Sequence, residues 1–169
     1  MRNLLLSLLL FSFITPSFAD VFEHKTSLKT VSSTLPELEN IKCQFKQEKI
    51  LKNIQKPIIS NGYFEFKKGE GVYFETIYPI KTSENYTNQN YKEINNVINL
   101  ISTKKYYKLE KEFDFYFEKN DSFWCLGLKP KNKNTAEFIS EIVIEGQDYI
   151  KKISINQTNG NCIKIWFTK

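Results

Sequence analysis

The side chains with the most versatile chemistry in this 169-residue chain are three cysteines and a single histidine. Cys43, Cys125 and Cys162 form no C-x-x-C pair, which excludes the usual redox and zinc motifs. His24 stands alone near the start of the chain, so the histidine clusters on which most hydrolase and metal chemistry depends are missing. We expect neither a metal nor a cofactor.

Two neighbouring carboxylates, Glu110 and Glu112, are the remaining candidates for enzymatic chemistry. General acid–base catalysis needs such a pair inside a cleft, whereas these residues alternate with lysine and have the character of solvated charges. We therefore predict that the protein is not an enzyme.

The cysteines can have a structural role instead, as a disulfide or as buried thiols. In an oxidising compartment one pair could close as a disulfide. Cys125 and Cys162 both lie in strand-like segments of the C-terminal half, so they are the favoured pair. Cys43 is then expected to be a small buried hydrophobe.

The N-terminus has the three parts of a secretory signal peptide. Arg2 supplies a positive end, residues 4–14 are apolar apart from two serines, and Ser17-Phe18-Ala19 offers small residues for the peptidase. A membrane anchor is the weaker interpretation, because spanning a bilayer takes about 20 apolar residues. We predict a signal peptide over residues 1–19 and one soluble periplasmic domain over residues 20–169. Asp20, rather than cysteine, follows the predicted cut, so no lipid anchor is expected there.

The formal net charge is +5, but lysines and glutamates alternate along the chain. Nucleic-acid binding requires a basic stripe with interleaved aromatic residues, and none is present, so we expect no nucleic-acid partner. A mild preference for anionic membrane surfaces stays open.

Hydrophobic periodicity predicts a helix over residues 21–35, which Pro36 ends, and then a strand over residues 41–45. A hairpin follows, with strands at residues 58–66 and 72–76 joined by a glycine-containing turn. A short amphipathic helix is predicted over residues 91–101. The later strands are predicted at residues 113–118, 123–128, 138–145, 149–157 and 162–168, with a turn at Asn159-Gly160.

Seven or so antiparallel strands with two helices predict a mainly β (α+β) fold, in which a curved sheet forms an incomplete barrel. The chain contains 14 Phe, 9 Tyr and 2 Trp. Composition alone favours a filled aromatic core. An incompletely closed barrel covered by the two helices would instead leave an apolar cavity.

The first hairpin and its neighbours carry a specific pattern: F-x-Q, then S-x-G, a basic turn, an aromatic residue followed by Glu, and a later Pro. In this pattern the chain resembles the LolA-type outer-membrane lipoprotein carriers, and it looks like a diverged member of that group. The matching residues are Phe45 and Gln47, Ser60 and Gly62, Lys67 and Lys68, Phe74 and Glu75, and Pro79.

The resemblance implies an incomplete barrel with a helical lid, whose apolar interior holds the acyl chains of lipoproteins. It also implies partners: an inner-membrane extractor and an outer-membrane acceptor, between which a monomeric carrier diffuses. Two departures leave the cargo open between lipoprotein, glycolipid and fatty acid. Lys68 stands where the family has an arginine that holds the lid, and the segment after Pro79 lacks the family's Asp-Gly-x-x-x-Trp stretch.

The site predicted from this pattern is a set of inward-facing apolar side chains, with Lys68 as a lid or headgroup contact. A register slip of one residue would invert every such assignment. The alternative is a protein-interaction module of the same fold with a filled core and no lipid. The predicted cavity residues are Phe45, Phe64, Phe66, Phe74, Phe115 and Leu126.

Overall fold

The computed structural model describes residues 20–35, 40–67, 70–84, 97–98, 100–101 and 105–169. Most of these residues are in strands. The short elements are the 3-10 turn η1 (Val21–Glu23) and the helices α1 (Leu28–Thr34), α3 (Tyr106–Glu112) and α4 (Lys133–Ala136). The strands are β1 (Lys25–Thr26), β2 (Ile41–Ile50), β3 (Ile58–Lys67), β4 (Gly71–Tyr78), β5 (Thr82–Glu84), β6 (Phe113–Lys119), β7 (Trp124–Pro130), β8 (Ile139–Gly146), β9 (Ile150–Gln157) and β10 (Cys162–Thr168).

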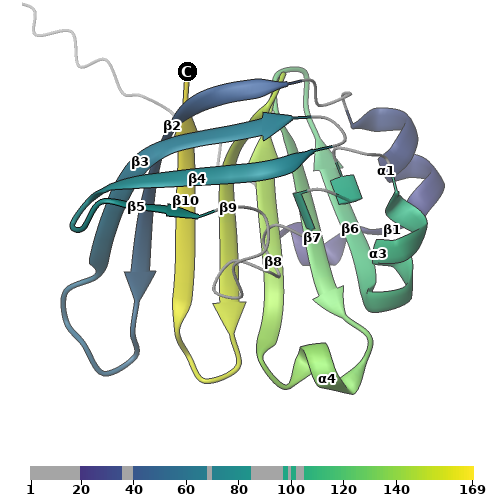
Figure 1. Ribbon diagram of the computed structural model, residues 1–169. Helices are drawn as coiled ribbons and strands as arrows, with labels where there is room; N and C mark the ends of the chain where they lie inside the picture. Colours follow the sequence, from purple (N-terminus) through teal and green to yellow (C-terminus); the bar gives the residue numbers. More distant parts are fainter. Residues whose placement is uncertain (1–19, 36–39, 68–69, 85–96, 99, 102–104) are drawn as a thin grey trace, which may run out of the picture.

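The ten strands described form one sheet in the order β1-β6-β7-β8-β9-β10-β2-β3-β4-β5 (Figure 1). Every pair of neighbours is antiparallel. The edge strands β1 and β5 do not pair with each other, so the sheet stays open rather than closing into a barrel. The mainly β prediction is confirmed at this level.

The predicted hairpin is present and longer than expected. Phe64 lies opposite Phe74, and Phe66 lies opposite Val72, so the apolar positions of both strands share one face. Gly71 has a φ of 106°, which explains why glycine is needed where β4 begins. Gly160, with a φ of 84°, lies in the predicted turn between β9 and β10.

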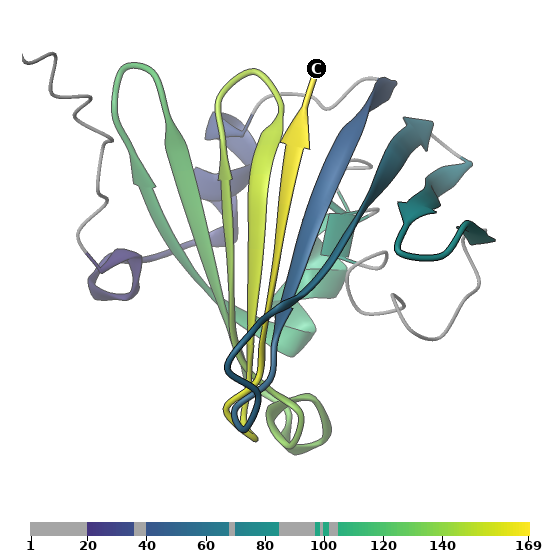
Figure 2. The same cartoon turned by 90° about the vertical axis from the view of Figure 1, so that its left-hand side faces the viewer.

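The sheet curls strongly, so that β2, β3 and β4 turn across the direction of the remaining strands (Figures 1 and 2). The register between β3 and β4 shifts at Asn61 and Gly62, a bulge that bends both strands. A methyl group on Gly62 would overlap the carbonyl oxygen of Glu75, so this close approach of the two strands requires glycine.

The prediction of one helix over residues 21–35 was wrong in extent. The side chain of Asp20 accepts a hydrogen bond from the Phe22 amide, which starts η1 instead of an α-helix. Lys25 then pairs with Tyr116 of β6, and α1 begins only after Ser27, whose hydroxyl caps the helix. Pairing with the sheet therefore overrides the helical periodicity of this segment.

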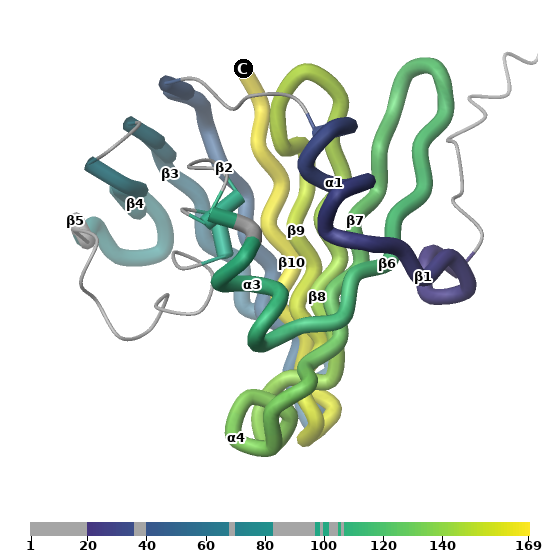
Figure 3. The backbone as a smooth tube through the Cα atoms, turned by 90° about the vertical axis from the view of Figure 1, so that its right-hand side faces the viewer, coloured from purple at the N-terminus to yellow at the C-terminus, as the bar shows by residue number. Residues whose placement is uncertain are grey.

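Helices α1 and α3 contact each other and lie on the open side of the curved sheet (Figure 3). Leu109 of α3 is fully buried there. Part of the second predicted helix is also present, because Val97, Ile98, Leu100 and Ile101 are helical and buried. The rest of residues 91–101 lies outside the described residues. Helices α3 and α4 were not predicted, since seven and four residues give too little periodicity.

Candidate functional site

The inner face of the curved sheet is an apolar wall that draws side chains from most of the strands. All six predicted cavity residues are on it, each no more than 5% exposed and each within one continuous cluster. The predicted inward face is therefore the buried face. These residues are Phe45, Phe64, Phe66, Phe74, Phe115 and Leu126.

Aromatic rings pack closely along the β10–β2–β3–β4 part of this wall. The ring centroids of Phe64 and Phe167 are 4.7 Å apart, and those of Phe64 and Phe74 are 5.0 Å apart. Phe45 meets Phe74 edge-on at 5.2 Å. These separations are typical of favourable aromatic contacts, so this part of the wall is filled by its own side chains.

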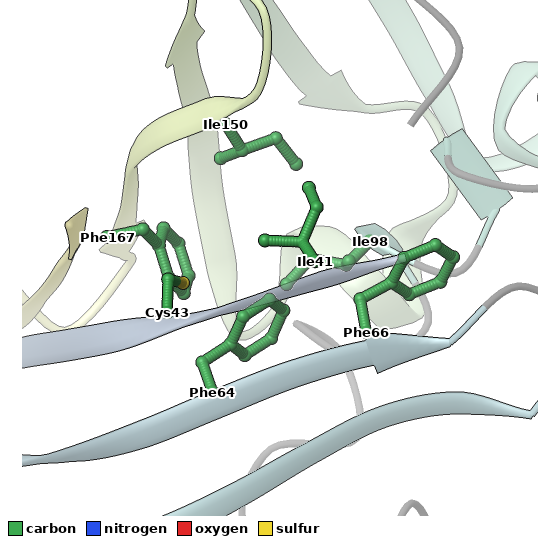
Figure 4. A pocket seen from close by; sticks show the side chains of 7 residues that line it. All are labelled: Ile41, Cys43, Phe64, Phe66, Ile98, Ile150 and Phe167. Carbon is green, nitrogen blue, oxygen red and sulfur yellow. The ribbon is translucent and has the colours of Figure 1, made fainter. Parts of the chain in front are cut away.

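A narrow crevice remains at the end of this aromatic row (Figure 4). It lies where the inner face of the sheet meets the helices that cover it, which contribute Ile98. Its volume is about 10 Å³, which is room for about one water molecule. The sequence prediction included two of its lining residues and missed the others, although Ile41, Cys43 and Phe167 share the alternating pattern of their strands. The lining residues are Ile41, Cys43, Phe64, Phe66, Ile98, Ile150 and Phe167.

One polar pair interrupts the apolar wall. Gln47 and Ser60 are opposite each other on β2 and β3, both are buried, and the Gln47 amide nitrogen donates to the Ser60 hydroxyl at 3.2 Å. The Gln47 carbonyl oxygen Oε1 is buried without a hydrogen-bond partner among the described residues. These are the glutamine and serine of the F-x-Q and S-x-G pattern, so the pattern brings its polar residues together.

The cover over the wall is made of short helices, and α1 buries few side chains of its own. Val31 is the buried residue of α1, with Leu35 directly after it and Leu28 packed against the same core. An isolated helix of seven residues is far shorter than the roughly 12–15 residues needed for marginal stability in water. Helix α1 is consequently held by these few apolar contacts, while Leu109 and the helical residues 97–98 and 100–101 bury further side chains in the same core.

The exposed side of α1 weakens it further. The hydroxyls of Ser32 and Ser33 donate to the carbonyls of Lys29 and Thr30, both at 3.0 Å. Thr34 also donates to the Thr30 carbonyl, at 2.8 Å. Serine and threonine with such local bonds have low helix propensity. The wall is a continuous hydrogen-bonded sheet, whereas this part of its cover is intrinsically weak.

The predicted disulfide is not formed, and the fold explains why. Cys125 on β7 and Cys162 on β10 are both free, with β8 and β9 between them in the sheet. Three strand spacings amount to about 14 Å, twice the Cα separation of about 7 Å that a disulfide can bridge. Cys43 is a buried thiol in the crevice, as expected, and burial raises its pKa to about 11.

Two further predictions lie outside the described residues: Lys68 as a lid or headgroup contact, and the signal peptide over residues 1–19. Within the described ranges, no helix is long and apolar enough to cross a membrane. The same ranges contain no group of three or more histidine, cysteine, aspartate or glutamate side chains placed to hold a metal ion.

No family model matches the chain, and no curated protein is significantly similar to it.

Proposed function

We propose that the protein is a periplasmic carrier that holds acyl chains against the inner face of its sheet and shuttles them between membranes. The observation that carries the proposal is the contrast between a rigid apolar wall and a weak helical cover. A carrier needs both, because the wall shields the chain and the cover must open to load and release it.

Burial of an acyl chain is worth about 0.8 kcal/mol per methylene, so such a chain does not cross water unshielded. Pockets for ligands of ordinary size measure about 300–1,000 Å³. The crevice of about 10 Å³ is too small for an acyl chain, so in the proposed carrier the structure corresponds to the closed, unloaded form. Loading requires α1 and the buried helical residues near Ile98 to move away from the wall.

The proposed carrier acts after export through its signal peptide and needs no catalytic residue. Its cargo is a lipoprotein or another acylated lipid, which it receives from an inner-membrane extractor and delivers, as a monomer, to an outer-membrane acceptor. These partners come from the resemblance to the LolA-type carriers.

The test is to purify the protein with its own leader processed by the host, extract it with solvent and identify bound lipids by mass spectrometry. Uptake of a fluorescent fatty acid is measured in parallel. We expect co-purifying acyl lipids and saturable uptake. The proposal fails if the wild-type protein contains no lipid and takes up no fatty acid.

A matched pair of variants on the sheet locates the binding face. Phe66→Glu on β3 places a charge on the apolar wall and is expected to abolish uptake, whereas Ser140→Glu, at an exposed position of β8, should leave it unchanged. Circular dichroism establishes whether both variants fold. Equal uptake by two folded variants would place the binding site elsewhere.

The close-packed rings favour one alternative, an interaction module of the same fold with a filled core. Such a module would bind a protein partner through its surface and no lipid. Lipid extraction and uptake separate the two functions, since a filled core gives a negative result in both.

A further inference from the structure

One corner of the molecule exposes large apolar side chains. Ile54 in the β2–β3 turn is 51% exposed, and Ile58 and Ile59 at the start of β3 are 49% and 38% exposed. At the end of β4 the values are 55% for Tyr78 and 71% for Ile80. Apolar side chains gathered in this way usually mark an interaction surface.

The register of the sheet connects the two groups. Tyr78 pairs with Asn61, two residues after Ile59, so the end of β4 lies beside the first part of β3. The β2–β3 turn is at the lower left of Figure 1 and the turn after β4 at its left edge, and Figure 2 shows the two turns apart, joined by the first part of β3. We name residues 49–59 together with residues 77–81 the isoleucine–lysine corner.

The charge of this corner has one sign over a long stretch. Lys49, Lys52 and Lys56 are all exposed, and residues 49–64 contain no Asp or Glu. None of these three lysines forms an ion pair with a described carboxylate, whereas Lys81 on the β4 side pairs with Glu75 at 3.7 Å. Glu48, which lies opposite Ile59, is paired with Lys46 at 2.8 Å, so the three lysines leave the surface beside the isoleucines with a net positive charge.

The patch continues onto the outer face of the sheet. Tyr63 and Ile77 are half exposed and line a surface groove of about 420 Å³ together with Lys46. Lys46 itself is paired with Glu48 at 2.8 Å, so the groove extends the apolar and aromatic part of the surface rather than its free positive charge.

Addition of a strand from a protein partner fits this edge poorly. β4 covers β3 only from Asn61 onward, so Ile58 and Ile59 begin an uncovered edge. Pro57 precedes them and has no amide proton, and Lys56 brings a charge, two features that discourage strand pairing at a sheet edge.

We propose that the isoleucine–lysine corner docks the protein onto the surface of a bilayer with anionic headgroups. Ile54, Ile58 and Ile80 enter the boundary between headgroups and acyl chains, while Lys52 and Lys56 extend to the phosphates. Docking is shallow and reversible, because a few isoleucines and lysines bind far more weakly than a spanning helix. The inference concerns the outer surface and does not depend on the cargo proposed for the inner face.

The test measures binding of the host-processed protein to sedimentable vesicles. One set contains phosphatidylglycerol in phosphatidylethanolamine, and the other contains phosphatidylcholine alone. We expect binding to the anionic set only, weakening as salt rises. Each lysine near an anionic surface raises the binding affinity about fivefold. We therefore expect a variant without the three lysines to bind about a hundredfold more weakly; it carries Lys49→Gln, Lys52→Gln and Lys56→Gln.

The apolar contribution is tested with Ile54→Ser and Ile58→Ser together, which should also reduce binding to the anionic vesicles. Tyr107→Ser with Lys108→Gln is the matched control, because both residues are exposed on α3, away from the corner, and this variant should bind normally. Thermal melting establishes that all variants fold.

Three results would overturn the inference: no binding to anionic vesicles, equal binding to both vesicle sets, or an equal loss in the control variant. A failed carrier proposal is distinguishable from these results. A protein that docks but carries nothing binds vesicles and takes up no fatty acid, whereas a carrier without docking shows the reverse.

Discussion

Gln47 and Ser60 are the exception on a wall that is otherwise apolar. Among the described residues, the buried Gln47 amide has one hydrogen bond, to a hydroxyl, and its acceptor Oε1 has no partner to compensate for its lost hydration. The two side chains lie in directly opposed positions of β2 and β3, so each depends on the other. Their energetic contributions should be strongly non-additive.

We predict that Ser60→Ala alone destabilises the fold by about 1–3 kcal/mol, because it leaves the whole Gln47 amide buried without a partner. The double variant with Gln47→Leu removes both polar groups and should recover to within about 1 kcal/mol of the wild type. Urea unfolding measures both values. Ser140→Ala, at an exposed position of β8, is the control and should change stability by less than about 0.5 kcal/mol. Additive losses in the double variant would contradict the pairing.

Cys125 lies on the outer face of the sheet between two carboxylates, opposite Glu118 on one side and Glu145 on the other. Burial, and then the negative charges of Glu145 and Glu118, raises the pKa of the Cys125 thiol to about 12. The thiol of the native protein is therefore protonated and a poor nucleophile at neutral pH.

We predict that Cys125 reacts with iodoacetamide only as fast as the protein unfolds. The raised pKa also makes stability depend on pH. Above the ordinary value of 9.0 the unfolded chain loses the thiol proton first, so this contribution to stability is complete below pH 9 and declines as pH rises toward 12. Urea midpoints across this range should fall less steeply for Cys125→Ala than for the wild type. Identical slopes would contradict the prediction.

At the scale of elements, the bend of β3 gives the sheet its curl. Gly62 lies at the bulge, where the β4 backbone approaches too closely for any side chain. The inner faces of β3 and β4 then turn over the rest of the wall, and the outer side of the same bend exposes Ile59 and Tyr78. The bend thus contributes to both the inner wall and the isoleucine–lysine corner.

We predict that Gly62→Ala destabilises the protein by about 2–3 kcal/mol, because the new methyl group displaces the Glu75 backbone. Asn61→Ala, at the adjacent exposed position, should have little effect and serves as the control. Thermal unfolding measures both. A neutral Gly62→Ala would mean that the two strands separate without cost and that the curl is easily deformed.

At the scale of the whole molecule, two layers of unequal stability face each other. The wall is held by a continuous ladder of strand hydrogen bonds, whereas the cover consists of short helical segments held by buried apolar side chains such as Val31, Ile98 and Leu109. Segments with few buried contacts open with low free energy. Movement of the cover is therefore the least costly way to expose the inner face.

Amide hydrogen exchange should show directly that the cover opens more easily than the sheet. We predict faster amide exchange in α1 and α3 than in β8, β9 and β10, and a change of exchange in α1 and α3 when a fatty acid is added. Helix α4 connects β7 and β8 apart from the cover, so its exchange should stay the same. Protection that changes uniformly through the sheet and α4 would contradict a moving cover.

Local sequence patterns were sufficient for the parts of the fold set by neighbouring residues. Alternation along β2 and β3 predicted which side chains face inward, because a strand reverses its side chains at every residue. Glycines at the β3–β4 and β9–β10 turns marked both hairpins, because Gly71 and Gly160 need positive φ. The six inward-facing residues of the proposed site followed from the same periodicity.

Contacts between segments that are distant in the sequence decided the other features of the fold. Residues 21–35 have helical spacing, yet pairing of Lys25 with Tyr116 across the sheet divides that segment. The choice of Cys125 and Cys162 as a disulfide failed because strand order, which no local pattern encodes, places two strands between them. The small crevice and the exposed corner likewise depend on how far the sheet curls. Sequence by itself determined the faces of the strands, and only the tertiary structure decided which faces meet, because contacts between distant segments arise from the packing of the whole chain.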